Sequence, residues 1–144
     1  MSEPMIDVKL LEGAPFFAGL SSEDLEGILQ VGRTVSFQPG DAIVEQGDVG
    51  DGMYIITEGA AEVDVGGRFH RLKPGDVFGE MALLSTGKRM ATVKAVETVQ
   101  AVMIPADGFR SFLESHPAVA LSMLTSVVDR LREVEQRIDA WMAS

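Results

Sequence analysis

The segment from Val77 to Val93 contains the residues whose types and spacing could bind a small anion. Gly79 follows a short apolar strand end, Glu80–Leu84 consists of good helix formers, and Gly87 ends that run. The first N–H groups of such a helix have no intrahelical partner. Together with the positive end of the helix dipole they form an anion site. Gly79 has no Cβ, so a ligand can approach the backbone closely there.

Two charged side chains accompany this helix start. Arg89 lies far enough downstream for the chain to fold back over the helix, and its guanidinium could donate two parallel hydrogen bonds to a phosphate. Glu80, in the first helical turn, can accept a hydrogen bond from a ribose hydroxyl, as acids do in dinucleotide sites. Taken alone, Glu80 could simply satisfy the helix dipole and Arg89 could form a surface ion pair. Their spacing after Phe78 and Gly79 favours a nucleotide site.

The residues around this segment have the pattern of short β-strands. The expected strands are Arg33–Phe37, Ala42–Glu45, Met53–Thr57, Ala60–Val65, Arg68–Leu72, Ala91–Val96 and Val99–Ile104. Short strands at spacings of about ten residues indicate an all-β sandwich or barrel. Residues 39–41 and 74–76 both read Pro-Gly-Asp and predict type II turns, and Gly66-Gly67 predicts a two-residue hairpin.

Helices are expected on both sides of the strands. Ser21 with Asp24 three residues later is an N-cap pattern that opens an apolar helical repeat. After the strands we expect a short helix, Ala106–Glu114, and a long helix that begins near Pro117 and runs to about Met142.

Apolar residues of the long helix repeat in steps of four and three. They are Ala120, Leu124, Val127, Leu131, Val134, Ile138 and Trp141. This spacing is an a/d seam, which favours a homodimer through the C-terminal helix. The alternative is a helix that lies along its own strands.

The composition excludes several classes of function. The 144 residues fit one domain, and 22 acidic against 12 basic residues give a net charge of −10, which opposes direct nucleic-acid binding. There is no cysteine, and His70 and His116 are isolated, so we expect no metal site. No catalytic set is recognisable, so we expect no enzyme. Without a long apolar run or a signal-peptide pattern, we expect a cytoplasmic protein with no membrane contact of its own.

The run FGE-x-ALL at residues 78–84, followed by R-x-ATV at residues 89–93, resembles the phosphate-binding cassette of cyclic-nucleotide-binding domains. Examples of this family are the domains of the catabolite activator protein and of the regulatory subunit of cAMP-dependent protein kinase. The resemblance implies a mainly β fold with flanking helices: an eight-stranded jelly-roll β-barrel with N-terminal helices and a long C-terminal helix. Residues 1–144 would form a single domain, with a helical head (1–32), a β-barrel (33–104) and C-terminal helices (106–142).

The resemblance also implies roles for individual residues. Glu80 would accept a hydrogen bond from the ribose 2′-hydroxyl, and Arg89 would neutralise the cyclic phosphate. The long helix would cover the base, although Glu135 could equally be a solvated surface residue. The expected ligand-binding set is Phe78, Gly79, Glu80, Met81, Ala82, Arg89, Met90, Ala91, Val134 and Glu135.

Two departures from the family pattern bear on the ligand. Lys88 stands where many members have proline, and Met90 stands where members that favour cyclic GMP often have threonine. Methionine cannot donate a hydroxyl to guanine, so the expected ligand is cAMP, with cGMP less favoured and no cofactor. The expected function is a signal-sensing module whose C-terminal helix moves on binding. The alternatives are a non-binding structural or dimerisation domain, and the sensor domain of a larger transcription regulator or channel.

Overall fold

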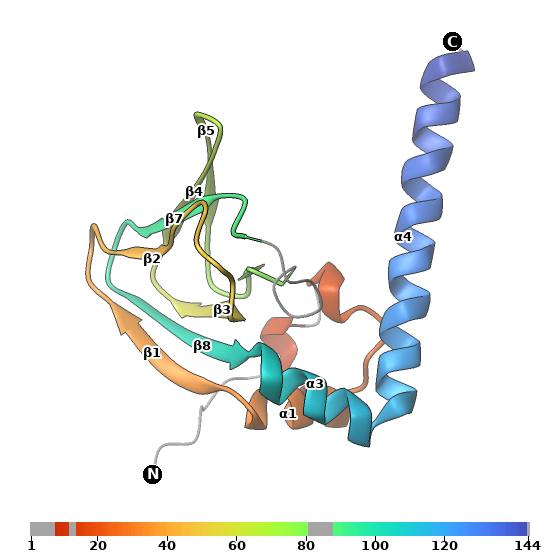
Figure 1. Cartoon of the computed structure of the whole chain (residues 1–144), viewed down its shortest axis with the longest axis horizontal. Helices are drawn as coiled ribbons and strands as arrows, with labels where there is room; N and C mark the ends of the chain where they lie inside the picture. The colour runs from red at the N-terminus through yellow and green to blue at the C-terminus, as the bar shows by residue number, and fades with distance from the viewer. Residues whose placement is uncertain (1–7, 12–13, 81–87, 144) are drawn as a thin grey trace.

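Three short helices precede the strands in the computed structural model, which describes residues 8–11, 14–80 and 88–143 (Figure 1). They are η1 (Val8–Leu11), η2 (Pro15–Phe17) and α1 (Ser22–Gln30). The Ser21 hydroxyl accepts a hydrogen bond from the Asp24 amide at 3.0 Å, and the Asp24 carboxylate accepts one from the Ser21 amide at 3.3 Å. This reciprocal capping confirms the helix start predicted from the sequence.

Eight strands follow within the described residues. They are β1 (Arg33–Phe37), β2 (Ala42–Val44), β3 (Gly52–Glu58), β4 (Ala61–Val65), β5 (Arg68–Leu72), β6 (Val77–Phe78), β7 (Thr92–Ala95) and β8 (Val99–Pro105). The seven strands predicted from the sequence are all present, with ends that differ by at most one residue. Both Pro-Gly-Asp segments form the expected turns, because the Asp41 amide donates to the Gln38 carbonyl and the Asp76 amide to the Lys73 carbonyl, each at 3.0 Å.

The strands form two four-stranded antiparallel sheets, in the orders β1-β8-β3-β6 and β2-β7-β4-β5. Among the described residues, no ladder joins an edge strand of one sheet to an edge strand of the other. The fold is therefore a sandwich with flanking helices, and the closed barrel expected from the resemblance is not formed. The edges explain this result, because β6 has two residues and β2 has three, which is too short to continue a ladder around a barrel.

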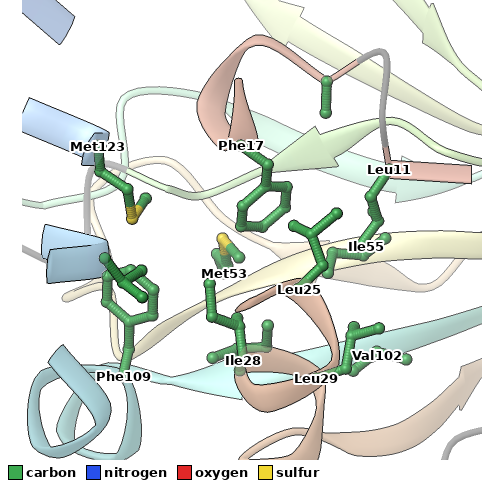
Figure 2. Packing of buried hydrophobic residues seen from close by; sticks show 13 residues of the cluster. Leu11, Phe17, Leu25, Ile28, Leu29, Met53, Ile55, Val102, Phe109 and Met123 are labelled. Atoms are coloured by element: carbon green, nitrogen blue, oxygen red, sulfur yellow. The ribbon is translucent and has the colours of Figure 1, made fainter. Parts of the chain in front are cut away.

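The core has two parts, one on each face of the sheet that contains β8. Val102 and Ile104 of β8 belong to a cluster that includes the helices, whereas Val99 and Ala101 belong to the cluster between the sheets. This division follows from the alternation of side chains along a strand. Figure 2 shows the helical cluster, in which residues of α1, β3 and α3 pack together. Its labelled members are Leu11, Phe17, Leu25, Ile28, Leu29, Met53, Ile55, Val102, Phe109 and Met123.

The chain ends in α3 (Ala106–Ser115) and α4 (Pro117–Ala143), close to the predicted bounds. Only the first turns of α4 are anchored in the core, through Val119 and Met123, and every residue from 127 to 143 is exposed. Figure 1 shows α4 extending away from both sheets. The structure therefore does not place this helix along its own strands. Among the described residues, no helix combines the length and the apolar character needed to cross a bilayer.

Candidate functional site

Arg89 reaches from the end of the cassette to the junction of two strands. Its Nη2 donates to the Gly52 carbonyl at 2.9 Å, and its Nη1 approaches the Gly79 carbonyl at 3.4 Å. Gly52 begins β3 and Gly79 directly follows β6, which pairs with β3. Only 7% of the Arg89 side chain is exposed. The structure thus brings together Gly79 and Arg89, two of the predicted site residues.

Gly79 is required at this junction for two reasons. Its φ angle is +80°, a conformation that other L-residues rarely adopt. A Cβ at this position would also lie 2.5 Å from Nη1 of Arg89 and 3.2 Å from the Gly52 carbonyl oxygen. Because Gly79 has no side chain, the guanidinium of Arg89 can occupy the space beside it.

The backbone of Arg89 is fixed against the loop that precedes β3. Its amide donates to the Asp48 carbonyl at 2.7 Å, and its carbonyl accepts from the Gly47 amide at 3.0 Å. Val49 and Lys88 form an isolated antiparallel bridge beside these bonds. Loop residues 45–51 therefore hold the base of the arginine side chain while the two strand ends hold its tip.

An aromatic pair lies beneath the guanidinium. The Tyr54 ring centroid is 6.0 Å from Cζ of Arg89, within range of a cation–π contact. Tyr54 stacks on Phe78, its cross-strand partner, with centroids 5.2 Å apart and an interplanar angle of 10°. Phe78 is buried, so it supports the site from within the protein. Tyr54 could not be predicted as a site residue from the sequence, because its position depends on the register between β3 and β6.

Burial and nearby charges shift the pKa of the Tyr54 phenol. Burial raises the pKa of the Tyr54 phenol above its ordinary value, and the nearby carboxylate of Asp51 raises it further. Arg89 and Arg33 act in the opposite direction and lower this pKa. Tyr54 is therefore a neutral phenol at physiological pH.

Asp51 is a second residue that the sequence analysis missed. Its Oδ1 lies 3.5 Å from Nη2 of Arg89, and 82% of its side chain is exposed. Its backbone carbonyl accepts a hydrogen bond at 2.9 Å from the amide of Ala106, the first residue of α3. A loop acid carries no periodic signal, so only the folded structure shows this contact.

Glu80 is half-buried and lines a cavity of about 440 Å³. The cavity lies between η2, the turn that leads into β6, and α4. Its charged lining residues are Lys73, Asp76, Glu80 and Arg130, the last from α4. The structure thus places a residue of the C-terminal helix at the same cavity as the predicted ribose acceptor.

The other predicted site residues fall into three groups. Met81 and Ala82 lie outside the described residues. Met90 is 70% exposed, and Ala91 is half-buried next to β7. Val134 and Glu135 are exposed on the part of α4 that extends from the molecule, and the structure does not bring them to the site. Their predicted contact with the base requires another position of α4.

No metal centre is evident in the described parts of the chain. In residues 8–11, 14–80 and 88–143, no three or more His, Cys, Asp or Glu side chains lie together in a way that could hold an ion.

A match to a protein-family model shows which family the chain belongs to. The family model of the cyclic nucleotide-binding domain matches residues 34–116, which is more than half of the chain. The chain belongs to the cyclic nucleotide-binding domain family. The matched region of this cyclic nucleotide-binding domain runs from β1 to the end of α3 and includes Gly79, Glu80 and Arg89.

Curated relatives of this cyclic nucleotide-binding domain include ion channels. The chain is 35% identical over 129 residues to the potassium/sodium hyperpolarization-activated cyclic nucleotide-gated channel 3 of Mus musculus, covering 89% of the chain and 17% of the channel. It is 32% identical over 130 residues to channel 2 of Homo sapiens, covering 90% of the chain and 15% of the channel. The chain therefore spans less than a fifth of the length of these relatives.

Two solved structures also resemble this chain over most of its length. The N-terminal domain of a transcriptional regulator from Streptomyces coelicolor A3(2) aligns with a TM-score of 0.79 and 29% identity, covering 88% of this chain and 95% of that chain. The catabolite activator protein of Thermus thermophilus aligns with a TM-score of 0.69 and 29% identity, covering 89% of this chain and 63% of that chain.

Proposed function

We propose that this cyclic nucleotide-binding domain is a cAMP sensor in which Arg89 binds the cyclic phosphate. The observation that carries the proposal is an arginine side chain that is 7% exposed and whose guanidinium lies against a glycine with positive φ. A guanidinium has five N–H donors, and the contacts to Gly52, Gly79 and Asp51 involve both Nη1 and Nη2. A phosphate that replaces the weaker contacts can form a bidentate, charge-assisted pair.

Glu80 is the proposed acceptor for the ribose 2′-hydroxyl. It follows Gly79 directly and is half-buried at the edge of the cavity. Hydroxyl donation to a carboxylate is a charge-assisted hydrogen bond, which is stronger than a neutral one. This contact would distinguish a ribonucleotide from its deoxy analogue.

The preference for cAMP over cGMP rests on Met90. This residue follows Arg89 and is 70% exposed, so a ligand at Arg89 can reach it. A thioether cannot donate a hydrogen bond to guanine, whereas a threonine hydroxyl can. The proposed order of affinity is therefore cAMP above cGMP.

The C-terminal helix is the proposed moving part. Arg130 of α4 and Glu80 line the same cavity, so a ligand that engages Glu80 would alter the charge that Arg130 faces. A ligand shifts such an equilibrium only by its different affinity for the two positions of the helix. In the liganded position, Val134 and Glu135 would approach the base.

We also propose that α4 forms a homodimer. Six seam residues are exposed large apolar side chains: Leu124, Val127, Leu131, Val134, Ile138 and Trp141. An exposed apolar seam of this length is typical of a helix that associates with a second helix. The similarity to channels and regulators is compatible with a sensor domain that belongs to a larger protein.

Titration calorimetry with cAMP and cGMP tests the proposed function. We expect micromolar or tighter binding of cAMP, weaker binding of cGMP, and no measurable binding by Arg89→Ala. Arg71→Ala is the matched control, because Arg71 is exposed and its side chain pairs with Glu97 at the surface, at 3.5 Å. If the wild-type protein gives no heat with either nucleotide, the sensor function is refuted.

A further inference from the structure

Tyr54 joins Arg89 to the aromatic residues of the sandwich. The Cζ atom of Arg89 lies over its ring, 6.0 Å from the centroid. The same ring stacks on Phe78 at an interplanar angle of 10° and meets the ring of Phe37 edge-on at 66°. All three aromatic side chains belong to, or pack against, the core cluster between the sheets. The ring of Tyr54 is therefore held by side chains of β1 and β6 while it contacts Arg89.

The backbone also fixes the position of Tyr54. Its strand, β3, lies between β8 and β6 in the sheet order. Tyr54 is the register partner of Phe78 on one side and of Met103 on the other. An arginine side chain is long and has many rotamers, whereas this ring is paired on both sides and stacked. The ring thus provides a fixed surface for a flexible cation.

The guanidinium of Arg89 is a cation with little access to water, because only 7% of its side chain is exposed. The Gly52 and Gly79 carbonyls accept hydrogen bonds from it, and the Asp51 carboxylate lies 3.5 Å away. The face of an aromatic ring is negative and attracts a cation without occupying a hydrogen-bond donor. This attraction is stronger for a desolvated cation than for an exposed one. The burial of Arg89 therefore strengthens its contact with Tyr54.

The ring and a phosphate would use different features of the guanidinium. A phosphate accepts hydrogen bonds from the N–H groups, and both Nη1 and Nη2 already have oxygen partners that it could replace. The ring attracts the positive charge as a whole and leaves the N–H groups to these oxygen atoms. The contact with Tyr54 can therefore persist when a phosphate binds. A side chain that is already held in place loses less conformational entropy on binding, which favours the ligand.

We propose that Tyr54 is a positioning residue of the phosphate site, whose ring holds the guanidinium of Arg89 by cation–π attraction and thereby raises the affinity for the cyclic phosphate. This inference rests on the proposed function, because it concerns the same arginine. It assigns the role to the electron-rich face of the ring and not to the hydroxyl group. Phenylalanine should therefore replace Tyr54, and leucine should not.

Calorimetric titration with cAMP of Tyr54→Phe and Tyr54→Leu is the first test. We expect Tyr54→Phe to bind within about twofold of the wild type, because the ring remains. Tyr54→Leu should bind about two- to thirtyfold more weakly, the range of a cation–π contact. Binding by Tyr54→Phe that is as weak as binding by Tyr54→Leu would assign the role to the hydroxyl group and overturn the proposal.

A series of fluorinated phenylalanines at position 54 separates cation–π attraction from packing. One, two and three fluorine atoms on the ring withdraw electrons from its face and change its shape little. We expect the affinity for cAMP to fall with each fluorine atom, to a total loss of about two- to thirtyfold. The same series at Phe109 is the matched control, because this ring is fully buried in the helical cluster. The control series should bind cAMP within about twofold of the wild type.

The remaining outcomes separate this inference from the proposed function. If the wild type binds cAMP and fluorination at position 54 leaves the affinity unchanged or raises it, the ring does not act through its charge, and the sensor function stands without this role. Equal losses in the series at positions 54 and 109 would be a general effect of fluorine and would also overturn the proposal. If the wild type binds neither nucleotide, the proposed function is refuted and the inference fails with it.

Discussion

A methyl group on Gly79 would lie 2.5 Å from Nη1 of Arg89, because the guanidinium occupies the space that a side chain at position 79 would need. The sequence separates them by ten positions, and the fold makes them a single unit. The glycine provides the room in which the guanidinium lies, and its carbonyl helps to hold it. A side chain at Gly79 should therefore disturb the position of Arg89.

Gly79→Ala should weaken both the fold and the site. A non-glycine residue at φ +80° costs about 1–3 kcal/mol, and the new Cβ must displace Arg89. We expect a lower denaturation midpoint and a loss of cAMP affinity of about tenfold or more. Gly40→Ala is the control, because Gly40 has φ +91° and a Cβ added there would meet no atom within 4 Å. The control should lose stability but retain affinity, and retained affinity in Gly79→Ala would contradict the prediction.

Glu80→Ala should reduce cAMP affinity about 10- to 100-fold, the value of a hydrogen bond to a charged group. The measurement is a double cycle with 2′-deoxy-cAMP. The wild type should bind the deoxy analogue as weakly as the variant binds cAMP, and the variant should no longer distinguish the two ligands. Equal affinity of the wild type for both ligands would show that Glu80 does not accept a hydrogen bond from the 2′-hydroxyl.

Tyr54 offers a direct test of the charges around the site, because it is the only tyrosine in the chain. Burial, followed by Asp51, raises the pKa of its phenol, so the phenolate absorbance should appear at a higher pH than in a short unfolded peptide. Asp51→Asn should lower this pKa, and Arg33→Gln should raise it.

The sign of the linked effect on stability follows from the same shift. A pKa raised by folding means that the neutral phenol is favoured in the native state. Its contribution to stability is therefore complete below the unfolded pKa of about 10 and is lost as the pH rises through the native value. Denaturant midpoints measured across this alkaline range should fall, and less steeply in Tyr54→Phe. A midpoint of titration at or below that of the free phenol would refute the shift.

The proposed dimer should depend on the apolar seam of α4. Leu131→Glu places a charge in the middle of that seam and should convert a dimer into a monomer, as measured by analytical ultracentrifugation. Gln136→Glu adds the same charge on the opposite face of the helix and should leave the dimer intact. A wild-type mass of about 15 kDa with and without cAMP, the mass of one chain, would refute the dimer.

Local signals in the sequence account for most of the fold. The alternation of apolar residues predicted seven strands, and the Ser21–Asp24 pair predicted the start of α1. β6 has two residues, too few for alternation to appear. The separation into two sheets depends on which edges pair, and this is a property of the whole fold.

Part of the site was also predictable from local signals in the sequence. Gly79 and Arg89 lie in one continuous motif, so their spacing alone suggested an anion site. Tyr54 and Asp51 reach Arg89 from β3 and the loop before it, through a register that the sequence does not display. The apolar seam predicted an exposed or associating helix but not its direction, and the structure leaves Val134 and Glu135 away from Arg89.

The single tryptophan of the chain, Trp141, is 79% exposed at the far end of α4, whereas the single tyrosine lies beneath Arg89. The unlabelled protein therefore carries two optical reporters at separate places. Tyrosine absorbance follows events at the proposed phosphate site, and tryptophan emission follows the environment of the helix tip. Stopped-flow recording of both signals after mixing with cAMP would give the order in which the site fills and the helix responds.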